Sequence, residues 1–355
     1  MGVRIKRLTF SWMLLALLAA GVARAEMVPD LHSAKVPVTN QSSSALTAAS
    51  REALAEVLVK VSGSYGLLKN PVIVAALAKP RSHVLQYAYI DSKTPAGGLS
   101  ARFEFDPAYI TDLLVRSGAP LWTANRPPVL AWVVVDDGQG RRFVNQEMEP
   151  EQAQQLMQAF SRRGVPVRLP LFDLADTAAV SLEDAWRLDG FIIQAGSARY
   201  DVQDVIVGRL SSPSDGKSNG DWSYFYQDER VNRSVSAPDL EAFVREGANI
   251  VAGQMAARYA IAPREGGDAG LRMSVTGVTS YTDYAAIVSW LEGLELVEYA
   301  NIVQVQGDRI ELLLQAQADA SQLASIIELN TRLLPAPVSV PGSELAAQLS
   351  YQWQN

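Results

Sequence analysis

The sequence contains no cysteine and only two histidines among its 355 residues. Without cysteine the chain can form no disulfide, has no thiolate nucleophile and offers no cysteine ligand to a metal. The two histidines are too few for the usual histidine metal sites or for a convincing catalytic triad. We expect His32 in a flexible amino-terminal segment and His83 on the surface, so neither histidine points to catalysis.

Positive charge is also scarce. Lysine and arginine number 31 against 38 aspartates and glutamates, which gives a net charge of −7, and no block of basic residues occurs. An acidic chain without a basic block is a poor candidate for binding nucleic acid or anionic lipid. We therefore expect no nucleic-acid partner.

Only one long apolar run occurs, Leu8–Val22. Three basic residues precede it, and Ala23-Arg24-Ala25 follows with the small residues that a signal peptidase recognises, which predicts a cleaved signal peptide over residues 1–25. The run is shorter than the roughly 20 residues that span a bilayer, so we expect no transmembrane anchor after cleavage. With no cysteine to lipidate, a lipoprotein is excluded. The sequence thus predicts a periplasmic protein, whose net charge would be −11 because residues 1–25 contain four basic residues and no acid.

Two stretches rich in proline or glycine, residues 123–128 and 262–270, divide the remaining chain. The roughly 330 residues left after cleavage are too many for one ordinary domain. We predict three domains, over residues 26–122, 126–262 and 270–355.

The first of these domains has the pattern of a small α+β unit. A strand near Lys35–Thr39 precedes a helix whose apolar residues from Leu46 to Val61 share one face, and Gly63 ends that helix. Val84–Asp91 and Leu99–Phe105 are typical of a hairpin. A further helix is predicted from Pro107, since proline is favoured in the first turn.

The central domain is predicted to be α/β with a mixed sheet. It begins with the apolar strand Val129–Val135 and a helix over residues 150–163. Further strands are predicted at Val165–Leu169, Gly190–Gln194, Asp204–Gly208 and Trp222–Tyr226. Ser236 to Asp239 resemble a capping box that introduces a long amphipathic helix. Helices and strands alternate first and strands dominate later, which favours a mixed over a fully parallel sheet.

The last domain has the order strand, helix, strand, strand, helix, strand. The predicted elements are Leu271–Val275, Thr282–Leu294, Val297–Val305, Ile310–Gln315, Ala320–Leu329 and Leu349–Trp353. This βαββαβ order is that of the ferredoxin-like fold. The order alone assigns no function.

The most conspicuous acidic pair is Asp136 and Asp137, which ends the strand Val129–Val135 and precedes Gly138-Gln-Gly140. Carboxylates and glycines at a strand end are found in metal and phosphate sites. A dinucleotide-binding loop, however, needs a third glycine and a following helix, and residues 141–144 are instead typical of a strand. Asp-Gly is itself a favoured hairpin dipeptide. A hairpin turn is therefore the favoured interpretation, and a metal or phosphate site at these two acids is the alternative.

The loop after residue 211 carries two weaker patterns. Ser214 and Lys217 match the S-x-x-K spacing of penicillin-binding enzymes, but proline and glycines around them argue against the helix that this chemistry needs. Asp215 to Asp221 faintly resembles a calcium loop, but Lys217 occupies a ligand position. A solvated hairpin tip is the favoured interpretation.

An aromatic stripe, Trp222, Tyr224 and Tyr226, alternates along one strand, so all three rings face one side of the sheet. Such a stripe could bind a ligand, which would require an exposed Trp222. More often it is core beneath a helix, here the one over residues 240–259. No motif in the sequence predicts a cofactor.

The chain resembles an uncharacterised family of exported proteobacterial proteins, the domain-of-unknown-function family 2066. The resemblance covers roughly residues 30–260 and rests on Val36-Pro-Val, Arg51 to Gly63, Asn70-Pro71, Phe105-Asp-Pro107 and the junction from Leu121-Trp122 to Arg126-Pro127. It implies an envelope-facing protein of Gram-negative bacteria with no established activity. At the level of fold only, the helix that ends at Gly63 resembles amino-terminal domains of flagellar ring proteins.

These observations favour a non-enzymatic periplasmic protein that binds another envelope protein as an assembly or accessory factor. One alternative is a periplasmic hydrolase that uses carboxylates or a metal around Asp136 and Asp137. Another is a protein that binds a small ligand or glycan on the aromatic stripe.

Overall fold

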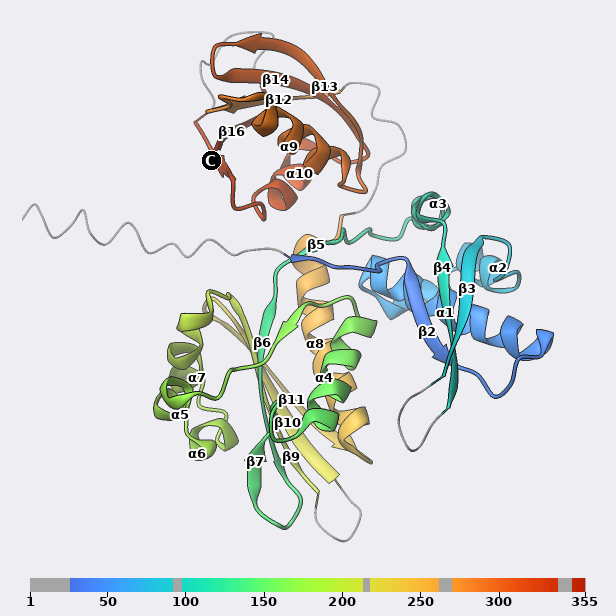
Figure 1. Ribbon diagram of the computed structural model, residues 1–355, viewed down its shortest axis with the longest axis vertical. Helices are drawn as coiled ribbons and strands as arrows, with labels where there is room; N and C mark the ends of the chain where they lie inside the picture. Colours follow the sequence, from blue (N-terminus) through green and yellow to red (C-terminus); the bar gives the residue numbers. More distant parts are fainter. Residues whose placement is uncertain (1–25, 92–97, 213–217, 262–269, 338–346, 355) are drawn as a thin grey trace, which may run out of the picture.

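The computed structural model describes residues 26–91, 98–212, 218–261, 270–337 and 347–354, and the predicted signal peptide lies outside them. Within these segments the chain forms four β-sheets and ten α-helices (Figure 1). The fold is therefore α+β with mixed sheets, as the sequence predicts. Within the same segments we find no helix with the length and apolarity that a bilayer crossing requires.

The amino-terminal unit packs helices against a three-stranded antiparallel sheet of order β2-β4-β3. Its strands are β2 (Ser33–Pro37), β3 (Val84–Asp91) and β4 (Leu99–Phe105), and its helices are α1 (Ser43–Ser62), the 3-10 turn η1 (Tyr65–Lys69), α2 (Pro71–Leu77) and α3 (Pro107–Ser117). Ser42 caps α1 by accepting a hydrogen bond from the backbone N–H of Ala45, and Gly63 ends it in the left-handed region. The predicted helices and hairpin of this unit are confirmed.

The central sheet has the order β11-β10-β9-β6-β7, with β8 beside β6. Its strands are β6 (Val129–Asp136), β7 (Arg141–Phe143), β8 (Val167–Arg168), β9 (Asp204–Ser211), β10 (Ser218–Tyr226) and β11 (Glu229–Ala237). Only β8 and β9 run parallel to β6, so the sheet is mixed as predicted. The helices α4 (Pro150–Arg162) and α8 (Leu240–Tyr259) cover one face, and α5 (Leu174–Ala179), α6 (Leu182–Trp186) and α7 (Gly190–Ser197), followed by the turn η2 (Ala198–Tyr200), lie on the other (Figure 1).

Two predictions for the central domain are wrong. Gly190–Gln194 is the start of helix α7, because Asp189 accepts hydrogen bonds from the N–H groups of Phe191 and Ile192 and so begins a helix. A short apolar run does not distinguish a buried strand from a helix by periodicity. Ser236 does not cap the last helix of this domain either: it lies in β11, and the cap of α8 is Asp239.

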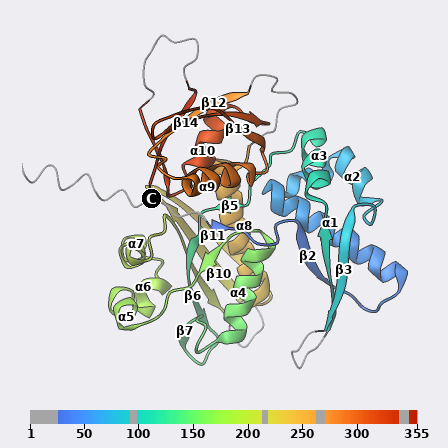
Figure 2. The same cartoon turned by 45° about the horizontal axis from the view of Figure 1, so that its top comes forward.

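The carboxy-terminal unit is a five-stranded sheet of order β13-β14-β12-β16-β15. Its elements are β12 (Leu271–Thr276), α9 (Tyr281–Glu292), β13 (Val297–Gln306), β14 (Arg309–Ala316), α10 (Ala320–Ile327), β15 (Leu333–Pro335) and β16 (Leu349–Trp353). The short β15 adds one strand to the predicted order, and the ferredoxin-like assignment stays a prediction. Figures 1 and 2 both show α9 and α10 on the side of this sheet that faces the rest of the chain.

The proline-rich stretch at residues 123–128 is a packed junction. Arg126 is fully buried, and its guanidinium lies over the ring of Trp122 at 3.6 Å. Its N–H groups donate to four carbonyl oxygens at 2.7 to 2.9 Å, those of Lys60, Trp122, Thr123 and Gly164. The end of α1, the junction and the end of α4 therefore meet at one side chain.

Strands and bridges also link the units at this junction. Strand β1 (Glu26–Met27) pairs with β5 (Asn125–Arg126), and Leu121 bridges to Ile261. The N–H of Ala124 donates to the carboxylate of Glu295 in the carboxy-terminal unit at 3.0 Å. The three predicted domain ranges stay a prediction, since residues 262–269 lie outside the described residues.

His32 is not in a flexible segment, which corrects the sequence-based prediction. Its carbonyl accepts a hydrogen bond from the N–H of Phe105, and its buried Nε2 has no hydrogen-bond partner in the protein. Burial, followed by the nearby cations Lys60 and Arg126, lowers the pKa of His32, and Asp106 only partly opposes them. The imidazole is therefore held neutral.

We predict that this histidine destabilises the fold in acid. Because the pKa of folded His32 lies below its ordinary value of 6.5, the unfolded chain binds more protons below that pH, and stability falls as the pH falls. His32→Gln should therefore lose less stability than the unchanged protein when urea unfolding is measured at about pH 7 and about pH 5. His83→Gln is the matched control, because His83 is exposed. Equal pH dependence in all three proteins would contradict the prediction.

A second prediction concerns the close approach of α1 and α8. A Cβ atom on Gly63 would lie 2.2 Å from the Cβ of Ala256, whereas one on Gly118, which has a similar positive φ, would meet nothing within 4 Å. Gly118→Ala should cost about 1 kcal/mol from the left-handed backbone alone. Gly63→Ala adds overpacking and should cost about 3 kcal/mol in the free energy of urea unfolding. Equal losses of stability in Gly63→Ala and Gly118→Ala would show that α1 and α8 do not pack closely at Gly63.

Candidate functional site

Asp136 and Asp137 form the turn between β6 and β7. Each carboxylate accepts a hydrogen bond from the N–H two residues later, and Gly138 and Gly140 both have positive φ. Each acid also pairs with an arginine: Asp136 with Arg141 at 3.5 Å and Asp137 with Arg142 at 2.8 Å. The hydrogen bond from Arg142 is the largest cause that lowers the pKa of Asp137.

Among the described residues, the same two acids gather no further ligands. Within the described segments no three histidine, aspartate or glutamate side chains come close enough together to hold a metal ion. The turn and the arginines account for both carboxylates. The structure thus places Asp136 and Asp137 in a hairpin turn, which agrees with the interpretation that the sequence favours.

The aromatic stripe belongs to the core beneath α8. Trp222 has no exposed surface, stacks on Phe243 at 4.4 Å and donates its indole N–H to the carbonyl of Phe243 at 3.1 Å. Tyr224 is buried as well, and Tyr226 is half-buried. Because ligand binding on this stripe requires an exposed Trp222, the stripe is not an open platform for a ligand.

A buried polar network joins the stripe to the end of α8. The hydroxyl of Tyr224 donates to Asp204, and Arg258 donates to Asp204 at 2.5 Å and to the Tyr224 oxygen at 2.7 Å. Burial raises the pKa of Asp204, while Arg258 and Tyr224 oppose that rise. No local sequence pattern indicates this network, because Asp204 and Arg258 are 54 residues apart.

Of the remaining candidates, those within the described residues are already engaged by neighbouring side chains. Ser214, Asp215 and Lys217 lie outside the described residues. Asp221, at the end of the stretch that faintly resembles a calcium loop, lies in β10 and pairs with Arg209 at 2.8 Å. His83 is exposed and stacks on Tyr109 at 3.4 Å between ring centroids.

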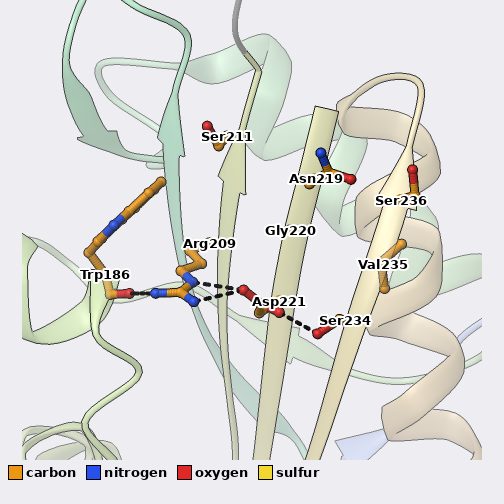
Figure 3. A pocket seen from close by; sticks show the side chains of 9 residues that line it. All are labelled: Trp186, Arg209, Ser211, Asn219, Gly220, Asp221, Ser234, Val235 and Ser236. Atoms are coloured by element: carbon orange, nitrogen blue, oxygen red, sulfur yellow. Dashed lines mark hydrogen bonds and ion pairs between the residues drawn. The ribbon is translucent and has the colours of Figure 1, made fainter. Parts of the chain in front are cut away.

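A hollow of about 560 Å³ opens on the face of the central sheet opposite α8 (Figure 3). It is lined by one residue at the end of α6 and by mostly polar residues of three adjacent strands: Trp186, Arg209, Ser211, Asn219, Gly220, Asp221, Ser234, Val235 and Ser236. Successive residues of a strand point to opposite faces, so Asp221 faces the hollow while Trp222 faces the core. The same pleat turns Arg209 and Ser234 toward Asp221.

Hydrogen bonds fix the floor of this hollow (Figure 3). Arg209 donates to Asp221 at 2.9 Å and to the carbonyl of Trp186 at 2.9 Å, and the Ser234 hydroxyl donates to Asp221 at 2.6 Å. Burial acts to raise the pKa of Asp221, but the hydrogen bonds from Ser234 and Arg209 outweigh it and lower the pKa. Asp221 is therefore a charged, already occupied acceptor near neutral pH, which favours a binding surface over a proton-transfer site.

The indole of Trp186 forms one wall of the hollow and connects it to the predicted acidic turn. Arg141 stacks on that ring at 4.2 Å, and the same guanidinium pairs with Glu183 at 2.7 Å and with Asp136. One side of the hollow is thus a rigid aromatic plane, and the opposite side carries hydroxyl and amide groups. With Arg209 and Asp221 paired, the lining suits a polar ligand without net charge.

Comparison with known proteins gives a family match for the amino-terminal part only. Residues 25–123 match a domain of unknown function (DUF8605). No curated protein matches the chain. The class that fold and sequence define is thus an α+β protein whose amino-terminal part is similar to a domain of unknown function.

Solved structures give weak similarity. A crystal structure of an uncharacterized protein is 12% identical, covers 37% of this chain and 90% of its own, and superposes with a TM-score of 0.17. A formyltetrahydrofolate deformylase from Pseudomonas putida KT2440 is 13% identical, covers 54% of this chain and 88% of its own, and has a TM-score of 0.16. Scores this low support no statement about fold or function.

Proposed function

We propose that this is an exported, non-enzymatic envelope protein of the kind that the resemblance to family 2066 implies, and that it binds a partner protein through the central sheet. The apolar run and small residues of segment 1–25 support export to the periplasm. The hollow in Figure 3 is the observation that carries the binding function.

The outer edge of strand β11 is the second part of the proposed binding surface, beside the hollow. Strand β11 is the terminal strand in the order of the central sheet, and within the described segments no other strand pairs with its outer edge. A nine-residue edge strand presents backbone N–H and C=O groups to an extended segment of another chain. Alternate side chains of such a segment would then reach the hollow beside Ser234 and Ser236.

The lining restricts the segment that fits. The hydroxyl and amide groups of the lining can hydrogen-bond small polar side chains of a partner. Because Arg209 and Asp221 pair with each other, the lining has no net charge that would attract a charged side chain. We therefore propose an extended, polar and largely uncharged stretch of an envelope protein as the partner.

A glycan is a second candidate, favoured by the plane of Trp186 beside the hydroxyl and amide groups. An aromatic face packs against apolar surface while neighbouring polar groups fix orientation. The hydrolase alternative has less support, since Asp136 and Asp137 are engaged by arginines.

Site-specific photo-crosslinking in intact cells tests the proposal. A photoreactive amino acid at Ser236 should give a protein adduct, and the same amino acid at Asn301, on the exposed strand β13, should not. Asn219→Trp fills the hollow and should reduce the Ser236 adduct at least about tenfold, and Asn301→Trp is its matched control.

The outcomes separate the two candidates. An adduct at Ser236 that shifts on digestion with a glycan-cleaving enzyme, and that yields no peptides of a second protein in mass spectrometry, would favour the glycan. Adducts of equal yield at both positions, or a yield unaffected by Asn219→Trp, would contradict binding in the hollow.

A further inference from the structure

A second cavity, of about 490 Å³, lies where the amino-terminal unit meets the central unit. Four elements line it: α1, η1, α4 and α8. Its residues are Glu52, Ala55, Glu56, Val59, Tyr65, Leu68, Gln155, Gln158, Ala159, Arg162, Arg163, Glu241 and Arg245. We call this cavity the interhelical groove. Its volume lies in the range that binds small organic molecules.

The groove combines apolar and charged surfaces. Small or branched apolar side chains come from α1, η1 and α4, namely Ala55, Val59, Leu68 and Ala159. The ring of Tyr65 adds an aromatic surface that is 51% exposed. An apolar surface of this size takes up the body of a ligand, while the charged side chains around it decide which polar group that ligand carries.

Arg163 is the residue that selects the polar group. It is only 4% exposed, its Nη2 donates to the carbonyl of Gly63 at 2.9 Å, and its guanidinium lies over the Tyr65 ring at 4.6 Å. Its Nε and Nη1 are buried and have no hydrogen-bond partner in the protein. Burial lowers the pKa of Arg163, and Tyr65 only partly opposes that change, as expected for a cation that no carboxylate neutralises. Buried N–H groups of a guanidinium require acceptors, and the oxygens of an anion are strong ones.

The other two arginines of the groove differ from Arg163 in exposure and in pairing. Arg162 is already paired with Glu56 at 2.8 Å and lies 4.0 Å from Glu52. Arg245 is exposed on α8 and forms no ion pair among the described residues. Arg163 inside the groove and Arg245 at its rim are therefore the cations available to a ligand.

We propose that the interhelical groove binds a small organic anion with an apolar or aromatic body. The anionic group of the ligand accepts hydrogen bonds from Arg163 and Arg245. The apolar body of the ligand lies on Ala55, Val59 and Ala159. Such a ligand contacts α1 of one unit and α4 and α8 of the other, so its binding stabilises the contact between them. This inference is independent of the hollow, which lies on the opposite face of the central sheet.

A pair of fluorescent probes tests the chemistry. Anilinonaphthalene sulfonate has an aromatic body and an anionic group, and phenylnaphthylamine has the same kind of body without the charge. Titration of the full chain should give saturable binding of the sulfonate at one site and binding of the uncharged probe at least about tenfold weaker.

Variants locate the site. Ala159→Phe fills the groove, and its control is Gln154→Phe, an exposed position on the same helix outside the groove. Arg245→Gln removes the rim cation, and its control is Arg233→Gln on exposed β11. Ala159→Phe should weaken sulfonate binding at least about tenfold and Arg245→Gln about fivefold, with both controls unchanged. Arg163→Gln should weaken the sulfonate but not the uncharged probe, and circular dichroism checks that this variant folds.

Three results would overturn the proposal. Equal affinity for the two probes would show that the anionic group is not recognised. Unchanged binding in Ala159→Phe would place the dye elsewhere on the protein. Unchanged sulfonate affinity in Arg245→Gln and in a folded Arg163→Gln would show that the two arginines do not hold the anion.

Discussion

The guanidinium of Arg126 is the contact on which the arrangement of the units depends. Burying a charged group is costly unless acceptors surround its N–H groups, and here four backbone carbonyls and the face of Trp122 surround the guanidinium. Burial lowers the pKa of Arg126 to about 9, and the nearby carboxylate of Glu295 only partly opposes that change. The acceptors come from the end of α1, the junction and the end of α4, so a single side chain fixes three segments.

Two glycines make this packing possible. A Cβ on Gly164 would lie 2.4 Å from Nη1 of Arg126 and 2.7 Å from Lys60, and one on Gly63 would meet α8 at Ala256. Both glycines have positive φ and end helices, so each reverses the chain where the helices meet. The interhelical groove lies directly beside them, with Arg163 preceding Gly164 and donating to the Gly63 carbonyl. The geometry of the groove therefore follows from the junction.

The hollow and the groove differ in the chemistry they offer. The hollow is neutral, because Arg209 and Asp221 satisfy each other, and its edge strand offers backbone groups. The groove contains a buried cation without an acid partner. A protein with both surfaces could bind a partner chain and a small anion at the same time.

Sequence reasoning predicted most elements, because their boundaries carry local information. Ser42, Asp106 and Ser280 cap helices, and the Asp-Gly turn at residues 137–138 joins a hairpin. The strand predicted at Gly190–Gln194 was wrong, because Asp189 caps a helix there although the run is apolar.

The binding surfaces could not be predicted in the same way. The residues of the hollow come from α6 and three strands, and serine, asparagine and aspartate are common in any exposed strand. Arg126 lies among prolines in a stretch typical of a linker, and Arg163 ends a helix where basic residues are ordinary. Only the tertiary structure shows that both arginines are buried.

Hydrogen–deuterium exchange on Arg126→Lys tests the central role of this side chain most directly. A lysine ammonium reaches fewer of the carbonyls than the planar guanidinium, so the variant should lose about 3 kcal/mol of stability. Amides around Lys60, Trp122 and Gly164 should exchange faster, while those of β13 and β14 in the carboxy-terminal sheet should keep their rates. Unchanged exchange around all three residues, at unchanged stability, would contradict the claim that Arg126 holds the units together.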